Sequence, residues 1–158
     1  MTKIFGALLF SIAAYFWGRE KGRLEEEKIL ILEALISFVA YTEEEITNFK
    51  TPLFRIYSEF HDSCLDKIGF IPLLRSEGIE KAKDVLKGKI SESSFKDVSA
   101  FAKGLGGGYS EGQKKLCEIT LKRLEKSVKD LKVSLAERVR MYRLLPILIS
   151  VSVIILLI

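Results

Sequence analysis

Proline, histidine and cysteine are scarce in this chain, and glycine is concentrated in one stretch. The 158 residues include three prolines, one histidine and two cysteines, and five of the eleven glycines fall within residues 104–112. A β-sheet needs turns spread along the sequence, and this distribution offers few of them. We therefore predict an all-α fold, and the length allows a single domain at most.

The scarcity of histidine and cysteine also limits metal and redox chemistry. His61 and Cys64 are close in sequence, but a zinc site usually takes four ligands, and Cys117 would have to arrive from another helix. We predict no metal and no cofactor. The alternative, a membrane-anchored metal- or redox-sensing protein that uses His61 and the cysteines, stays open.

No nucleotide or nucleic-acid signature is present. The glycine-rich stretch lacks the Lys-Ser/Thr ending of a phosphate loop, and Tyr109 stands where the third glycine of a dinucleotide fingerprint would fall. The 25 basic and 21 acidic residues give a formal charge of +4 without a concentrated basic run, so we predict no nucleic-acid partner. Since no catalytic constellation is recognisable, we predict that the protein is not an enzyme.

Charge is absent from both ends of the chain, at residues 4–18 and 144–158. A helix of about 15 residues spans about 22 Å, less than the roughly 30 Å hydrocarbon core, so we expect interfacial side chains and local thinning of the bilayer to supply the remaining length. Basic residues flank both runs on their inner sides. They are Arg19, Lys21 and Arg23 after the first run, and Arg138, Arg140 and Arg143 before the second.

These runs divide the chain into an N-terminal transmembrane anchor (1–18), a central helical domain (19–143) and a C-terminal transmembrane segment (144–158). By the positive-inside rule the central domain lies in the cytoplasm and both termini lie outside. A cleaved signal peptide would need a small-residue cleavage site after the first run, and none is convincing. A buried core helix is the alternative for the second run, which contains Pro146. We expect a cell-membrane protein that crosses the membrane twice.

The central part is predicted to be a helical bundle that begins and ends with a long helix. The first helix continues from the anchor to about Phe49, and residues 29–40, which include Leu35, are apolar almost all round. This apolar band indicates burial among several helices or against another protein. The last helix starts at Ser110, whose spacing to Gln113 is that of a capping box. Its apolar residues follow a heptad-like seam: Cys117, Leu121, Leu124, Val128, Leu131, Leu135, Val139 and Tyr142.

Three short helices are predicted between the long ones. Thr51 is the expected N-cap of the first, with Pro52 at its first helical position. Gly69 and Pro72 bound a connection to the second, and Ser94 with Asp97 starts the third in a capping-box spacing. The expected apolar faces are Leu53, Ile56, Tyr57, Phe60 and Cys64, then Ile79, Ala82, Val85 and Leu86, then Val98, Phe101 and Leu105.

The order of several short motifs resembles the stage III sporulation protein AB family of endospore-forming bacteria, from one end of the chain to the other. After a short N-terminal anchor come Glu45-Ile46, Thr51-Pro52-Leu53, Leu105-Gly106 with Gln113 eight residues after the leucine, and Met141-Tyr142-Arg143 before a tail that ends Val-Ile-Ile-Leu-Leu-Ile. Two residues depart from the family pattern. Tyr109 stands where an aspartate is expected, and Pro146 where glycine is usual, so no role is carried over for an acidic residue in that loop.

The resemblance implies a structural role. Family members resemble the cytoplasmic helical domain of the F-type platform proteins of type II secretion and type IV pilus machines. They belong to the transenvelope complex that joins the mother cell and the forespore after engulfment. The implied partners are the other subunits of the stage III sporulation complex, including a secretion-type ATPase, at the mother-cell membrane around the forespore.

The resemblance leaves open a homo-oligomer, and the residues alone leave open a generic anchored adaptor outside sporulation. The interaction candidates come from the apolar band and from the family motifs. They are Leu35, Thr51, Pro52, Leu53, Leu105, Gly106, Gln113, Met141 and Tyr142.

Overall fold

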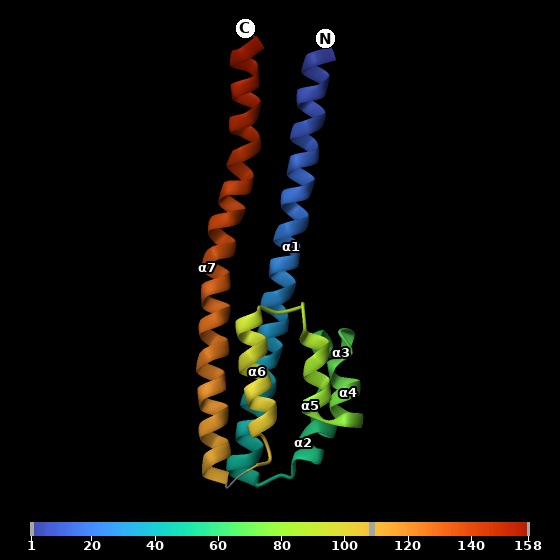
Figure 1. The fold of residues 1–158 in the computed structure, drawn as a ribbon, viewed down its shortest axis with the longest axis vertical. Helices are drawn as coiled ribbons and strands as arrows, with labels where there is room; N and C mark the ends of the chain where they lie inside the picture. The colour runs from blue at the N-terminus through green and yellow to red at the C-terminus, as the bar shows by residue number, and fades with distance from the viewer. Residues whose placement is uncertain (1, 108–109, 158) are drawn as a thin grey trace. The chain divides into compact units, whose positions relative to one another are not determined.

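A computed structural model describes the backbone of residues 2–107 and 110–157, and the side chains of residues 23–107, 111–138 and 141. The described backbone is helical apart from short connections and contains no strand (Figure 1), which confirms the all-α prediction. The chain divides into two compact units. One comprises residues 1–27 and 130–158, and the other comprises residues 28–129.

One long helix begins the chain and another ends it, and the shorter segments come between them in the sequence (Figure 1). The order is α1 (Thr2–Glu44), η1 (Glu45–Phe49), α2 (Leu53–Glu59), α3 (Ser63–Lys67), α4 (Phe70–Glu77), α5 (Ile79–Ala82), η2 (Lys83–Leu86), α6 (Glu92–Gly104) and α7 (Ser110–Leu157). The segment η1 is a π-helix and η2 is a 3₁₀-helix. The long first helix was predicted to end near Phe49, and it does so through this π-helical turn.

Helical backbone covers residues 2–18 and 144–157 of the predicted membrane segments, in α1 and in α7. The side chains of residues 1–22 and 142–158, on which the prediction of membrane anchors depends, lie outside the described residues. Among the residues that the structure does describe, no helix offers a stretch long and apolar enough to cross a bilayer.

The core of the unit at residues 28–129 is centred on Phe38 of α1. Its ring centroid lies 6.4 Å from that of Tyr57, 5.1 Å from that of Phe60 and 5.9 Å from that of Phe70. Three helical segments thus meet at one aromatic cluster, and edge-on ring contacts of this kind add to the free energy gained by burial. Leu35, about one turn earlier on α1, is only 1% exposed.

The apolar band at residues 29–40 is therefore buried mainly inside its own unit. Buried members are Ile29, Ile31, Leu32, Ala34, Leu35, Phe38 and Val39. Among its large apolar side chains, Leu30 is 55% exposed and Ile36 is half-buried. Of the two readings that the sequence allowed, burial among several helices of the same domain is the one observed.

Helix α6 packs closely on α7. A Cβ atom added at Gly104 would lie 2.8 Å from Leu116 Cδ2, so the two helices approach more closely here than a larger residue would permit. An ion pair of 2.9 Å between Arg123 Nη1 and Asp97 Oδ1 joins the same helices.

The heptad-like seam of α7 is confirmed where it is described within this unit. Cys117, Leu124 and Val128 are buried, and Leu121 is half-buried. Thr120 also turns inward, where its hydroxyl donates a hydrogen bond of 2.8 Å to the Leu116 carbonyl oxygen. In the other unit Leu131 and Leu135 are half-buried, while the side chains of Val139 and Tyr142 lie outside the described residues.

The region after α2 contains more helices than predicted. Cys64 was expected on the face of the first short helix, but it lies in the separate helix α3, where Asp62 Oδ1 accepts hydrogen bonds from the Cys64 and Leu65 amides. Pro72 was expected in a connection, but it lies in the first turn of α4. The missing amide hydrogen of proline has no helical partner at that position, so the residue is compatible with the helix.

Two predicted helix caps were wrong. The N-cap of α2 is Pro52 and not Thr51, whose hydroxyl bonds to Glu45 instead. The N-cap of α6 is Ser91, whose Oγ accepts a hydrogen bond from the Ser94 amide. Ser94 is therefore inside the helix and buried. The side chain of Ser110, the predicted cap of α7, lies outside the described residues.

Candidate functional site

Five of the predicted interaction residues line one groove in the unit at residues 28–129. They are Thr51, Pro52, Leu53, Gly106 and Gln113, and with Ile46 and Lys50 they enclose an open groove of about 410 Å³. Ile46 belongs to η1, Leu53 begins α2, and Lys50, Thr51 and Pro52 form the connection between these two helices. Gly106 and Gln113 belong to the connection from α6 to α7 and to the start of α7. The groove thus unites two motifs that are far apart in the sequence.

The backbone of the first wall is unusual. Glu45–Phe49 is π-helical, and Lys50 follows it in the left-handed region at φ 53°. The left-handed conformation costs free energy in a residue other than glycine, and both π-helical turns and such strained residues are concentrated at functional positions in proteins. The hydroxyl of Thr47 is also buried without a hydrogen-bond partner within the described part of the chain.

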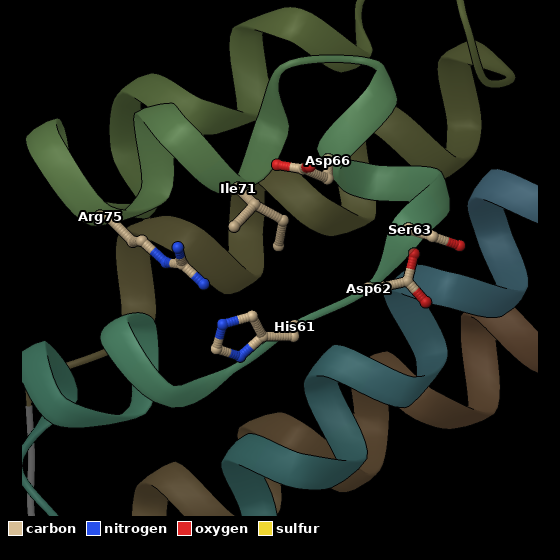
Figure 2. A pocket seen from close by; sticks show the side chains of 6 residues that line it. All are labelled: His61, Asp62, Ser63, Asp66, Ile71 and Arg75. Carbon is tan, nitrogen blue, oxygen red and sulfur yellow. The ribbon is translucent and has the colours of Figure 1, made fainter.

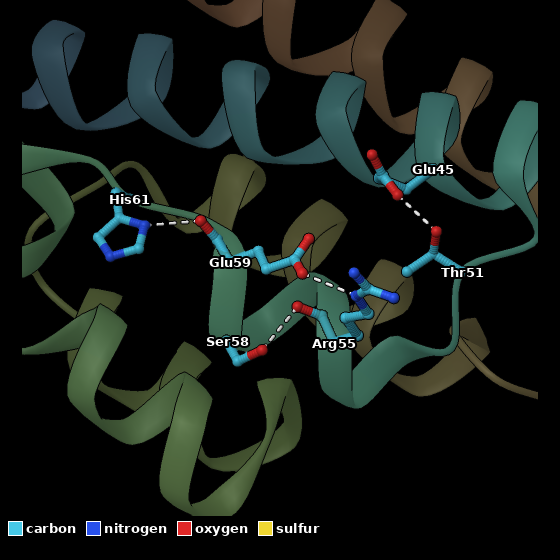
Figure 3. Close-up of polar contacts among 6 residues, drawn as sticks. All are labelled: Glu45, Thr51, Arg55, Ser58, Glu59 and His61. Carbon is cyan, nitrogen blue, oxygen red and sulfur yellow. Dashed lines mark hydrogen bonds and ion pairs between the residues drawn. The ribbon is translucent and has the colours of Figure 1, made fainter.

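A hydrogen bond across this turn holds its shape. Thr51 Oγ1 donates to Glu45 Oε2 at 2.5 Å (Figure 3). The Thr51 amide also donates to the Glu45 carbonyl oxygen at 3.1 Å. Hydrogen bonds to a charged acceptor contribute about 1.5–3 kcal/mol each. Thr51 therefore fixes the exit of the chain from the long helix, which is a structural task different from the capping role that the sequence indicated.

The opposite wall requires glycine at residue 106. Gly106 has φ +86°, and an added Cβ would lie 3.0 Å from Leu53 Cδ1. A side chain here would strain the backbone and press on the leucine that forms the other wall. Gly106 and Leu53 thus place the two connections in direct proximity.

Two exposed aromatic side chains accompany the groove. Phe49, directly before Lys50, is 65% exposed, and Phe54, directly after Leu53, is 74% exposed. Exposed aromatic side chains that adjoin the lining residues of a groove are candidates for contact with a partner, because aromatic residues are enriched at protein interfaces. The sequence could have pointed to these two phenylalanines only through their position beside the Thr51-Pro52-Leu53 motif.

The remaining interaction candidates lie elsewhere. Leu35 is inside the core, and Leu105 is the half-buried C-cap of α6, next to Gly106 but not part of the groove lining. Met141 belongs to the other unit and is exposed. The side chain of Tyr142 lies outside the described residues.

A second hollow, of about 300 Å³, surrounds the only histidine. Figure 2 shows its lining side chains, which are His61, Asp62, Ser63, Asp66, Ile71 and Arg75. Most of its polar groups hold the local backbone. His61 Nδ1 donates to the Glu59 carbonyl oxygen at 2.6 Å, Arg75 Nη2 donates to the Phe60 carbonyl oxygen at 3.1 Å, and Asp62 caps α3. These hydrogen bonds fix the path of the backbone between α2 and α4, and this structural role accounts for the three polar side chains.

The part of the chain that the structure describes offers no set of ligands for the metal-sensor alternative. No group of three or more His, Cys, Asp or Glu side chains there could hold a metal ion. The redox alternative needs an accessible thiolate. Cys117 is fully buried, and this burial raises the pKa of its thiol to about 11.

Cys117 is therefore expected to resist thiol reagents in the folded protein. At pH 8 a pKa of about 11 leaves roughly one thiol in a thousand as thiolate, and burial also blocks the reagent. In the detergent-purified chain, an Ellman-type reagent should modify the half-buried Cys64 first and Cys117 only when denaturant is added. The Cys64→Ala variant isolates the second thiol, and rapid modification of that variant without denaturant would contradict the expectation.

A family model described as Stage III sporulation protein AB matches residues 3–158, which is nearly the whole chain. No curated protein and no solved structure matches it.

Proposed function

Because the chain belongs to the stage III sporulation protein AB family, which implies a role in sporulation, we propose that it is a structural platform subunit of the complex between mother cell and forespore. In this proposal two terminal helices anchor the protein in the mother-cell membrane. The helical domain between them faces the cytoplasm and is presented to a secretion-type ATPase and to other subunits of the complex.

The observation that carries the proposal is the groove. Motif residues that are distant in the sequence converge on one open surface beside two exposed phenylalanines, whereas no metal site is found among the described residues and the thiol of Cys117 is buried. A protein with such a surface acts by holding a partner. Aromatic side chains commonly supply most of the binding free energy at protein interfaces.

Replacing both exposed phenylalanines is expected to impair sporulation without unfolding the protein. The double variant Phe49→Ala, Phe54→Ala should lower the count of heat-resistant spores on the order of tenfold or more, since loss of two interfacial aromatics typically weakens binding by at least that factor. Membrane abundance and helicity should stay unchanged, because both side chains are exposed.

Two controls make this result specific. Leu30 and Ile119 are also large, apolar and exposed, but they lie outside the groove, so Leu30→Ala, Ile119→Ala should sporulate normally. His61→Ala should do so as well, since His61 only bonds to a neighbouring carbonyl. A folded and abundant His61 variant that fails to sporulate would count against the platform role and favour a sensing site.

The proposed topology makes a separate prediction. Glu125 is exposed on α7, so a cysteine placed there in a chain without Cys64 and Cys117 should react with a membrane-impermeant thiol reagent only after the membrane is made permeable. A cysteine in place of Thr2 is the matched control and should react in intact vegetative cells that express the chain. Labelling at position 125 in intact cells would exclude the cytoplasmic assignment.

A further inference from the structure

The two segments that form the groove carry an excess of positive charge. Residues 45–55 and 103–115 contain five basic residues and two acidic residues, Glu45 and Glu111, and so carry a formal charge of +3. The five basic residues are Lys50, Arg55, Lys103, Lys114 and Lys115.

Most of this charge is not compensated locally. Arg55 pairs with Glu59 at 2.7 Å, but the four lysines are exposed and make no ion pair with the residues that the structure describes. The carboxylate of Glu45 accepts the hydrogen bond from Thr51. The groove is therefore an apolar hollow, formed in part by Ile46, Pro52 and Leu53, with Lys50 in its lining. Lys114 and Lys115 directly follow the lining residue Gln113 in the sequence.

We infer that the groove binds an acidic peptide segment of a partner protein. An apolar side chain of that segment enters the hollow between the two connections and packs beside Phe49 and Phe54. Carboxylates on either side of this anchor lie near Lys50 on one wall and near Lys114 and Lys115 beyond the other. This inference rests on the proposed platform function and specifies the chemistry of the partner.

Charge favours this occupant over two others. A second copy docked through the same face would place one positively charged surface against another, which opposes a symmetric contact. An anionic lipid headgroup would satisfy the lysines, but it would leave the apolar hollow and the exposed phenylalanines unfilled. An acidic segment with an apolar anchor satisfies both features.

Photo-crosslinking in sporulating cells tests the inference. The full chain carries benzoylphenylalanine in place of Phe54, and mass spectrometry identifies the attached molecule. We expect a peptide from another protein with an excess of Asp and Glu around the attachment site. The triple variant Lys50→Asp, Lys114→Glu, Lys115→Glu should reduce the crosslinking yield on the order of tenfold, because several charge contacts are reversed together. Aspartate is chosen at residue 50 because it tolerates a positive φ better than most residues.

The control reverses charge elsewhere in the same unit. Lys87→Glu, Lys89→Glu changes two exposed lysines outside the groove segments and should leave the yield unchanged. Attachment to a lipid, to a second copy of this chain, or to a neutral or basic peptide would overturn the inference. An equal yield from a folded triple variant would also overturn it.

The same experiment separates this inference from the platform proposal. A basic or neutral peptide from another subunit of the sporulation complex would support the platform role and overturn the acidic partner. An acidic peptide from a protein outside that complex would support acidic recognition and count against the platform role. Loss of crosslinking in both the triple variant and the Lys87, Lys89 control would indicate a general charge effect and overturn the inference.

Discussion

Leu35→Asp is expected to unfold the unit at residues 28–129. Leu35 is 1% exposed, next to the Phe38 aromatic cluster. The change removes about 2–3 kcal/mol of apolar burial and leaves a carboxylate without a partner in the core, which costs several kcal/mol more. The free energy of unfolding of a domain is only about 5–15 kcal/mol, so the expected loss is comparable with the whole stability of the unit.

Accessibility of Cys117 offers a direct measurement of this unfolding. Its thiol is buried in the same unit, so an unfolded Leu35→Asp variant should react with thiol reagents without denaturant, and its helicity and spore count should fall. Leu30→Asp is the matched control, because it introduces the same side chain on the same helix at a residue that is 55% exposed. A protected Cys117 in the Leu35 variant would show that the core tolerates the charge.

Leu124→Ala is expected to lower the free energy of unfolding of the same unit by about 2–5 kcal/mol. Leu124 is fully buried on the α7 seam, and truncation of a buried leucine loses both its transfer free energy and the contacts around the cavity that remains. Urea titration of the detergent-purified chain, followed by the rate of Cys117 modification, measures the loss as a lower transition midpoint.

Two neighbouring lysines calibrate this measurement. Lys126 and Lys129 are exposed on α7, and their replacement by Ala should change the free energy of unfolding by no more than about 0.5 kcal/mol. Leu131→Ala should cost less than Leu124→Ala, since Leu131 is only half-buried. Equal losses at Leu124 and at the two lysines would show that the seam does not stabilise this unit.

The periodicity of apolar residues sufficed to predict the long elements. The band at residues 29–40 and the seam from Cys117 to Val128 are local patterns, because each helix buries the stripe that its own sequence defines. The motif order likewise sufficed to identify the family, which the match to residues 3–158 confirms. Membrane anchoring, inferred from the uncharged ends, stays a prediction.

Short helices and caps were less predictable, since several residues competed for each role. Ser91 and Ser94 both precede suitable helical residues, and only the packed structure shows that Ser94 is buried and that Ser91 is the cap. Proline usually marks a break in a helix, yet Pro72 is compatible with the first turn of α4. Local sequence does not decide such cases, because the alternative caps and helix boundaries differ little in free energy. Tertiary contacts contribute more than this difference and so select one of them.

The groove was decided by the tertiary structure alone. The sequence contained Thr51, Leu53, Gly106 and Gln113 as separate motif residues, but it gave no indication of the π-helical turn or of the left-handed Lys50 that brings the first wall into place. Contact between Leu53 and the backbone at Gly106 joins residues more than fifty positions apart. Such a contact depends on how the helices pack and not on the periodicity of either segment, so sequence determined the helices while packing determined the candidate binding surface.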